Sequence, residues 1–284
     1  MIKLCAFADE YNDNLDKQIE GLKLNNIDYI ELRTVNGTNV ADLTDKQAID
    51  TYEKLSKSNI KVWSIGSPLG KVDIDCNFDE YKKIIERVCV IANIMHCDKV
   101  RMFSFFNAYD KKEKVFSYLQ EMVNIGKKYN VLMCHENEKD VFGDSVDRVL
   151  EIQANVKGLK YVYDPANFVQ CKQDSDYAIE KLFDSITYFH IKDVIASSEQ
   201  LVPAGYGDGK IEKFLSKIDK NNDVVLTLEP HLAEFQAYKK IDTTVMKHKF
   251  NFNSHEEAFN FAAKSLKEIL LKIGYKEKDN CFIK

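Results

Sequence analysis

The chain has 284 residues and a formal net charge of −5, from 40 Lys and Arg against 45 Asp and Glu. With 45% hydrophobic and 30% charged residues, the composition excludes a disordered or fibrous chain. The mild acidic excess argues against general nucleic-acid binding, which needs basic surface, and no apolar run approaches the ~18 residues of a membrane helix. The seven cysteines form no C-x-x-C pair, so we expect free thiols in a reducing cytoplasm.

Short apolar runs alternate with longer amphipathic stretches along the whole chain. Each run has the length of a strand, and most are rich in Val, Ile, Phe and Tyr. In chain order, the predicted strands are Lys3–Phe7, Tyr29–Leu32, Lys61–Ile65, Lys99–Phe103, Val131–His135, Leu159–Tyr163, Ile186–Ile191 and Val224–Leu228.

Amphipathic helices are predicted between these runs, because apolar residues recur there every three or four positions. The clearest stripes lie within residues 15–22, 81–92, 116–125 and 146–152. The residues expected to cap three of these helices at the N-terminus are Asn14, Thr44 (or Asp45) and Asp144.

Strands that alternate with helices predict a parallel sheet. Eight of them in a chain of this length fit an α/β fold of the (β/α)8 TIM barrel class, with eight parallel strands in a single domain that spans residues 1–284. The structural alternative is an open doubly wound sheet, which usually has a glycine-rich turn after its first strand. Residues 8–12 contain no glycine, so we favour the barrel.

Polar residues at the carboxyl ends of the strands are the candidates for chemistry, because a TIM barrel has its active site at that end. Side chains alternate between the faces of a strand, so Glu136, Asp164, His190 and Glu229 can project from four adjacent strands at one height. Three carboxylates and an imidazole suit one divalent ion such as Mn²⁺, Mg²⁺, Zn²⁺ or Co²⁺. Each residue alone could be a helix cap or a loop residue. Their shared parity favours a metal site, since burying three carboxylates without compensation is costly. His135 has the opposite parity and is interpreted as structural.

Other strand-end residues are candidates for substrate binding. Lysine outnumbers arginine 36 to four, yet Arg33 and Arg101 both end predicted strands, where a planar fork could bind substrate or pair with a carboxylate at the rim. The remaining candidates are Ser67, Glu138, Asn167, Lys192 and Asp193. The glycine-rich segment 202–210 lacks the G-K-[ST] ending of a nucleotide-binding loop, so we interpret it as a loop over the substrate mouth.

Five motifs together resemble the xylose isomerase-like TIM barrels, with the sugar phosphate isomerases and epimerases as the nearest group. They are His135-Glu136-Asn137-Glu138, Asp164-Pro165-Ala166-Asn167-Phe168, His190-Ile191-Lys192-Asp193, the loop Pro203–Gly209 and Leu228-Glu229-Pro230. The resemblance implies that Glu136, Asp164, His190 and Glu229 bind one divalent metal. In the ketose 3-epimerase branch the two glutamates also act as the acid/base pair.

The chain departs from its relatives at two of these positions. Asn167 stands where the epimerase branch often has a histidine, and Glu138 replaces a histidine that many relatives carry on strand five. The extra histidines of the endonuclease IV branch are absent, which argues against a role in DNA repair.

The resemblance implies a metal-dependent isomerase or epimerase of a sugar, sugar phosphate or similar polyol. Such an enzyme moves a proton next to a carbonyl through a metal-stabilised enediolate. A lyase of the inosose or dehydroshikimate dehydratase type starts with the same deprotonation and remains an alternative, as does a non-catalytic sugar-binding barrel. The expected partners are a small sugar or polyol and further copies of the chain in a dimer or tetramer, with no nucleic acid and no membrane. We favour a free polyol, because no glycine-rich turn opens onto a helix N-terminus after strands seven and eight.

Overall fold

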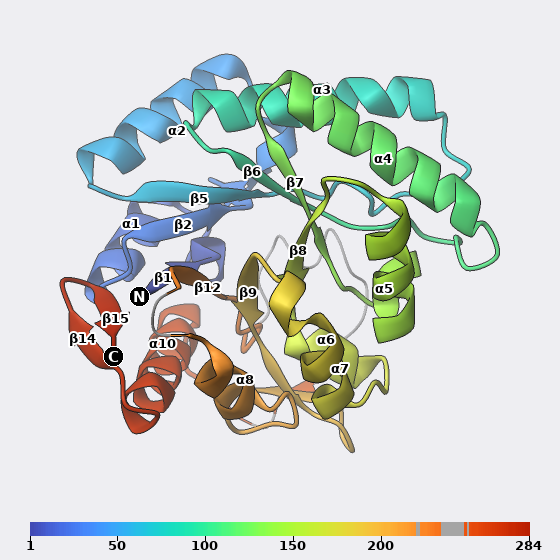
Figure 1. The fold of residues 1–284 in the computed structure, drawn as a ribbon. Coiled ribbons are helices and arrows are strands. Elements are labelled where there is room, and N and C mark those ends of the chain that lie inside the picture. Colours follow the sequence, from blue (N-terminus) through green and yellow to red (C-terminus); the bar gives the residue numbers. More distant parts are fainter. Residues whose placement is uncertain (220–221, 234–246, 249) are drawn as a thin grey trace.

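Eight parallel strands form a closed barrel at the centre of the structure, a computed structural model that describes residues 1–219, 222–233, 247–248 and 250–284 (Figure 1). The barrel strands are β1 (Ile2–Ala6), β2 (Tyr29–Leu32), β5 (Lys61–Gly66), β6 (Lys99–Met102), β7 (Leu132–Glu136), β8 (Lys160–Tyr163), β9 (Tyr188–Ile191) and β12 (Val224–Leu228). Each pairs in parallel with the next, and β12 closes the barrel against β1. Every boundary lies within two residues of the predicted one, which confirms the barrel.

Helices surround the barrel on the outside (Figure 1). They are α1 (Leu15–Leu24), α2 (Asp45–Lys57), α3 (Phe78–Ile94), α4 (Lys112–Lys128), α5 (Val146–Asn155), α6 (Pro165–Gln170), α7 (Ser175–Leu182), α8 (Ile211–Lys217) and α10 (His255–Lys272). Short 3-10 turns are η1 (Ala8–Glu10), η2 (Val40–Asp42), η3 (Phe142–Asp144) and η4 (Phe183–Ser185). Among the described residues no helix is long and apolar enough to span a bilayer.

Two of the three predicted helix caps are confirmed. Asn14 accepts two backbone N–H groups at the start of α1, and Thr44 forms a capping box with Gln47 at the start of α2. The prediction for Asp144 is wrong, because Ser145 caps α5 instead. The Asp144 carboxylate pairs with Arg148 at 2.7 Å, one turn into that helix.

Small apolar side chains and one tyrosine fill the interior of the barrel below the carboxyl ends of its strands. They are Cys5, Cys134, Val162, Tyr188 and Val225, all buried. Cys134, Val162 and Tyr188 each precede a predicted metal ligand by two positions, on the strand or directly after it. The alternation of side chains therefore places the ligands on top of this packed layer, facing the mouth.

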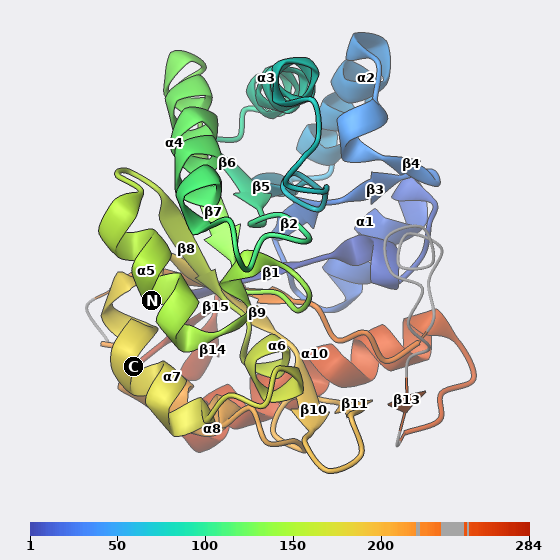
Figure 2. The same cartoon turned by 90° about the vertical axis from the view of Figure 1, so that its right-hand side faces the viewer.

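Two short hairpins and one small three-stranded sheet are added to the barrel. The hairpin β14 (Lys276–Lys278) and β15 (Cys281–Ile283) adds to β1 in antiparallel pairing, beside its first residues. The hairpin β3 (Thr34–Val35) and β4 (Thr38–Asn39) follows β2, and β10 (Asp193–Ile195), β11 (Gln200–Val202) and β13 (Lys247–His248) form a small sheet after β9 (Figure 2). The last two features lie beyond the carboxyl ends of the strands, so they help to frame the mouth.

Candidate metal centre and its cavity

Four buried side chains meet at the carboxyl ends of β7, β8, β9 and β12. One ligand-type atom from each of Glu136, Asp164, His190 and Glu229 lies within 4.8 Å of the others. The His190 Nδ1 atom is 2.8 Å from Glu136 Oε1 and 3.1 Å from Glu229 Oε2. The structure therefore brings together the four residues predicted as metal ligands.

His190 is held from below by a carboxylate. Its Nε2 atom is 3.1 Å from Glu31 Oε2, and Glu31 also accepts hydrogen bonds from Tyr188 and Thr227 at 2.9 Å each. Burial would raise the pKa of Glu31, but the His190 ring and these donors hold it below its ordinary value. An ionised Glu31 keeps the proton on Nε2, which directs Nδ1 towards the cluster.

Three carboxylates around His190 control the pKa of its ring. Burial would lower the pKa of His190, but Glu136, Glu31 and Glu229 overcome that effect and raise it well above its ordinary value. Burial would raise the pKa of Glu229, and Lys192 and His190 instead bring it well below its ordinary value. Both shifts favour a charged pair between the His190 ring and the Glu229 carboxylate.

Asp164 also caps a helix, and its two oxygens have separate partners. Oδ1 accepts the backbone N–H of Asn167 at 2.9 Å as the N-cap of α6, and Oδ2 lies 2.8 Å from Lys192 Nζ. Burial raises the pKa of Asp164 to about 7, against the lowering effect of Lys192. Asp164 thus caps a helix, as its position after a strand allows, and also belongs to the ligand cluster.

Arg33 ties three buried acids together on one side of the cluster. Its guanidinium bonds to both oxygens of Asp9 at 2.9 Å, to Glu229 at 3.1 Å and to Glu10 at 3.2 Å, and it lies 4.3 Å above the centre of the Phe7 ring. Burial raises the pKa of Glu10 to about 8, although Arg33 opposes the rise. Glu10, Glu229 and His231 form a second group of close ligand-type atoms, but the Arg33 fork already bonds to both of its carboxylates.

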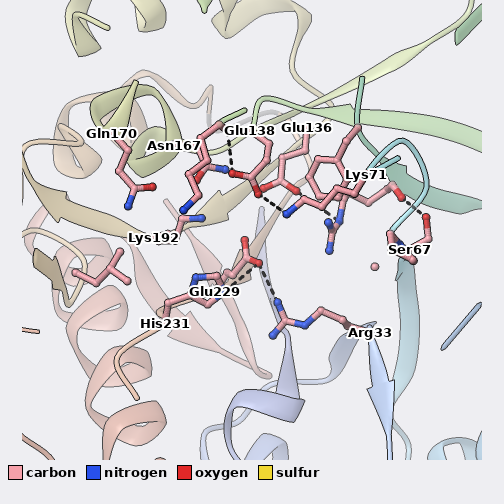
Figure 3. A pocket seen from close by; sticks show the side chains of 16 residues that line it. Arg33, Ser67, Lys71, Glu136, Glu138, Asn167, Gln170, Lys192, Glu229 and His231 are labelled. Atoms are coloured by element: carbon pink, nitrogen blue, oxygen red, sulfur yellow. Dashed lines mark hydrogen bonds and ion pairs between the residues drawn. The ribbon is translucent and has the colours of Figure 1, made fainter. Parts of the chain in front are cut away.

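A cavity of about 660 Å³, its open mouth included, lies above the cluster (Figure 3). Lys71 and Glu138 form an ion pair of 2.8 Å across its rim. Arg101 Nε lies 3.4 Å from Glu136, and its guanidinium carbon lies 4.5 Å above the Phe103 ring. The cavity therefore combines an aromatic wall with paired charges, as expected for a small polar ligand.

Six of the seven residues predicted to bind substrate line this cavity. They are Arg33, Ser67, Arg101, Glu138, Asn167 and Lys192. The two uncharged residues among them are hydrogen-bonded within the protein: the Ser67 hydroxyl donates to the Arg101 carbonyl at 2.6 Å, and the Asn167 amide donates to the Asn137 carbonyl at 2.9 Å.

Asp193 is not among the residues that line the cavity. Its carboxylate accepts the backbone N–H groups of Gly205, Gly207 and Gly209 at 2.9 to 3.0 Å, and so orders the glycine-rich loop. A Cβ atom on Gly207 would lie 2.3 Å from Asp193 Oδ1, so this close approach requires glycine. Asp193 therefore organises this loop and lies outside the residues that line the cavity, and its contact with a substrate stays a prediction.

Reasoning from the sequence missed several residues of the site. Glu31 was considered only as a partner for a cation at the mouth, although it shares the inward parity of Arg33 two positions later and contacts His190. Glu10 was considered in the same way and does pair with Arg33. His231 was given no role, yet its backbone N–H donates to Glu10 at 2.8 Å and its side chain lines the cavity. The sequence feature that could have identified Glu10 and His231 is their position a few residues after the carboxyl end of a predicted strand. His135, interpreted as structural, is buried beside Gly143 and Tyr161, outside the residues that line the cavity.

A family model for the xylose isomerase-like TIM barrel matches residues 22–252. The chain belongs to this family. None of the curated proteins compared with the sequence matches it. The family membership confirms the resemblance carried by the five motifs.

Solved structures agree on the fold of this family member. A probable 3-DHS dehydratase, AsbF, from Bacillus anthracis has a TM-score of 0.71 at 14% identity, over 94% of this chain and 99% of that one. A D-allulose 3-epimerase from Methylomonas sp. has a TM-score of 0.73 at 13% identity, over 94% and 98%. An IOLI protein with a bound zinc atom has a TM-score of 0.70 at 18% identity, over 95% and 99%. At these identities the likeness concerns the fold alone.

Proposed function

We propose that this protein is a metal-dependent isomerase or epimerase of a sugar or similar polyol. The observation that carries the proposal is the cluster of Glu136, Asp164, His190 and Glu229 at the floor of a cavity, with ligand-type atoms within 4.8 Å of one another. Neighbours in the fold include an epimerase, a dehydratase and a zinc-bound protein, which supports a divalent metal and chemistry next to a carbonyl.

The residues present fit a divalent metal. Three buried carboxylates and one imidazole whose second nitrogen is held by Glu31 form a hard ligand set of the kind that Mn²⁺, Mg²⁺, Zn²⁺ and Co²⁺ accept. When bound, the metal would polarise the substrate carbonyl and offset the negative charge that develops on its oxygen. The four side chains named above would hold it.

Glu136 and Glu229 are the proposed acid/base pair. They flank His190 Nδ1 and both line the cavity, so each can reach a substrate above the cluster. Arg33 orients Glu229, and Arg101 lies beside Glu136. One glutamate removes the proton, and the other returns one to the same carbon or its neighbour.

An uncharged polyol fits the cavity better than a sugar phosphate. Arg33, Lys71, Arg101 and Lys192 each pair with a carboxylate, so none of them is left to bind a phosphate group without giving up a partner. Comparing kcat/KM for matched free and phosphorylated ketoses tests this choice. A preference of about a hundredfold or more for the phosphorylated form would contradict it, since that corresponds to about 2.7 kcal/mol.

The second candidate is a dehydratase, whose reaction begins with removal of the same proton next to the carbonyl. Lys192 and His231 line the cavity beside the acid/base pair, where either could protonate a departing hydroxyl group. Ketoses and cyclic ketones incubated with Mn²⁺ in D₂O and followed by NMR separate the candidates. Deuterium at the carbon next to the carbonyl with an epimer or isomer supports the first proposal, and loss of water supports the second.

The same panel tests the non-catalytic alternative. Purified protein that contains no metal and neither exchanges deuterium nor converts any substrate would favour a binding barrel. Assembly into a dimer or tetramer stays a prediction, which light scattering tests; a single monomer peak at high protein concentration would reject it.

A further inference from the structure

Asp164 has one carboxylate oxygen left for a cation. Its backbone is fixed by Asn137, whose side chain accepts the Asp164 N–H at 2.9 Å and donates to the Asp164 carbonyl at 2.8 Å. Its Oδ1 atom is used by the N–H of Asn167 at the start of α6. Oδ2 accepts no backbone N–H, so it is the oxygen of this residue that is better placed to bind a metal ion.

That oxygen is occupied by a cation from the chain itself. Lys192 Nζ lies 2.8 Å from Asp164 Oδ2, and the two residues are 5% and 0% exposed. Lys192 comes two positions after His190, so both side chains point to the interior of the barrel, and Figure 3 shows the Lys192 amine inside the cavity.

We propose that Lys192 is a built-in competitor of the divalent ion for Asp164: it neutralises the site without metal and is released into the cavity when metal binds. The inference rests on the proposed function, because it takes Asp164 as a metal ligand. A metal bound to Oδ2 at ~2.0–2.6 Å would lie within about 5 Å of an ammonium on the same oxygen. Two like charges so close in a buried site repel strongly, so the ammonium has to leave.

The cavity offers the released ammonium another carboxylate. Glu138 is among the carboxylates whose charge acts on Lys192, and it lines the same cavity beside Lys71. Lys192 would then present its donors to a substrate oxygen instead of to Asp164. The substrate-binding wall is therefore complete only in the metal-loaded protein, which requires metal to bind before substrate.

The first experiment compares Mn²⁺ affinity by calorimetry in three proteins. Lys192→Met keeps the length of the side chain but removes the charge, and we expect it to bind Mn²⁺ at least about tenfold more tightly than wild type. Lys71→Met is the matched control, because it removes a charge from the same cavity that pairs with Glu138 rather than with a ligand. We expect a clearly smaller gain there. A dissociation constant in Lys192→Met that is unchanged, weaker, or shifted no more than in the control overturns the inference.

The second experiment uses only the wild-type chain, so it tests the inference even if a variant fails to fold. Crystal structures with and without Mn²⁺ should show Lys192 Nζ within hydrogen-bond distance of Asp164 Oδ2 without metal and more than ~4 Å away with it. An intact pair beside bound metal overturns the inference alone. Failure of wild type to bind Mn²⁺, Mg²⁺, Zn²⁺ or Co²⁺ overturns the proposed function and this inference together.

Discussion

Replacing Arg33 by methionine is expected to destabilise the barrel strongly. The guanidinium makes four hydrogen bonds to Asp9, Glu10 and Glu229, all at the buried mouth, and the methionine would keep only the contact with Phe7. Removing one partner of a buried ion pair costs about 3–5 kcal/mol, because the remaining charge stays buried without compensation.

The protonation of Glu10 places the expected loss at the lower end of that range. Burial already raises its pKa to about 8, so at neutral pH it is largely protonated and loses little when Arg33 is removed. The cost then falls on Asp9 and Glu229, and we expect about 3 kcal/mol at pH 7. That is a large share of the 5–15 kcal/mol typical of folded domains.

Urea unfolding followed by circular dichroism, in a metal-chelating buffer at pH 7, measures the loss. The matched control is Arg87→Met, since Arg87 pairs with Asp45 on the surface, where the two side chains are 31% and 67% exposed. An exposed pair contributes about 0–1 kcal/mol. If Arg33→Met shifts the urea midpoint no more than Arg87→Met, with equal slopes, the reasoning about buried charges at the mouth is refuted.

Three further predictions concern catalysis, metal and pH. Glu136→Gln and Glu229→Gln should each lower kcat/KM by at least about 10²-fold, while the circular dichroism spectrum stays unchanged. Glu212→Gln is the surface control. Residual turnover above a tenth of wild type in either of the first two variants would exclude the acid/base role. Chelation of the metal should abolish activity and leave a cooperatively folded protein. Mn²⁺ at 100 times its dissociation constant should add about 2.7 kcal/mol to the unfolding free energy of wild type, but not to that of Asp164→Asn. Equal stabilisation of the two proteins would argue against Asp164 as a metal ligand. Burial raises the pKa of Tyr81 to about 12, so the folded state keeps a proton that the unfolded state loses above pH 10. Stability should therefore fall by about 1.4 kcal/mol per pH unit between pH 10 and 12 through this residue, and urea unfolding of Tyr81→Phe should show a shallower decline.

The barrel and its four-residue cluster could be predicted because both depend on local patterns. Apolar runs of strand length mark the eight barrel strands, and alternation along each strand decides which side chain faces inward. Glu136 and Glu229 lie 93 positions apart in the sequence, yet closure of the barrel brings both to His190. A parallel barrel turns position at a strand end into proximity in space, so no contact information was needed.

What could not be predicted depends on contacts between distant segments. The sequence allowed Arg33 either to bind substrate or to pair with acids. Which of the two it does depends on Glu229, which follows the strand on the other side of β1. Asp193 follows His190 by three positions, and only the fold shows that three glycine N–H groups enclose its carboxylate. The hairpin β14–β15 was missed because its first strand, Lys276–Lys278, is exposed and has no apolar alternation.

The two kinds of cation at the mouth have different tasks, and their chemistry matches those tasks. Arg33 is paired with Glu229, and Arg101 lies beside Glu136, both acids of the proposed acid/base pair. A planar fork that is always charged suits pairs that have to keep their orientation through a reaction. Asp164 is paired with Lys192 instead. A point charge on a flexible stem suits a pair that opens when metal arrives, because the ammonium can find new partners without moving the backbone. Exchanging the two types should therefore damage the site in opposite ways: lysine at Arg33 would loosen the orientation of Glu229, and arginine at Lys192 would compete more persistently for Asp164 and weaken metal binding.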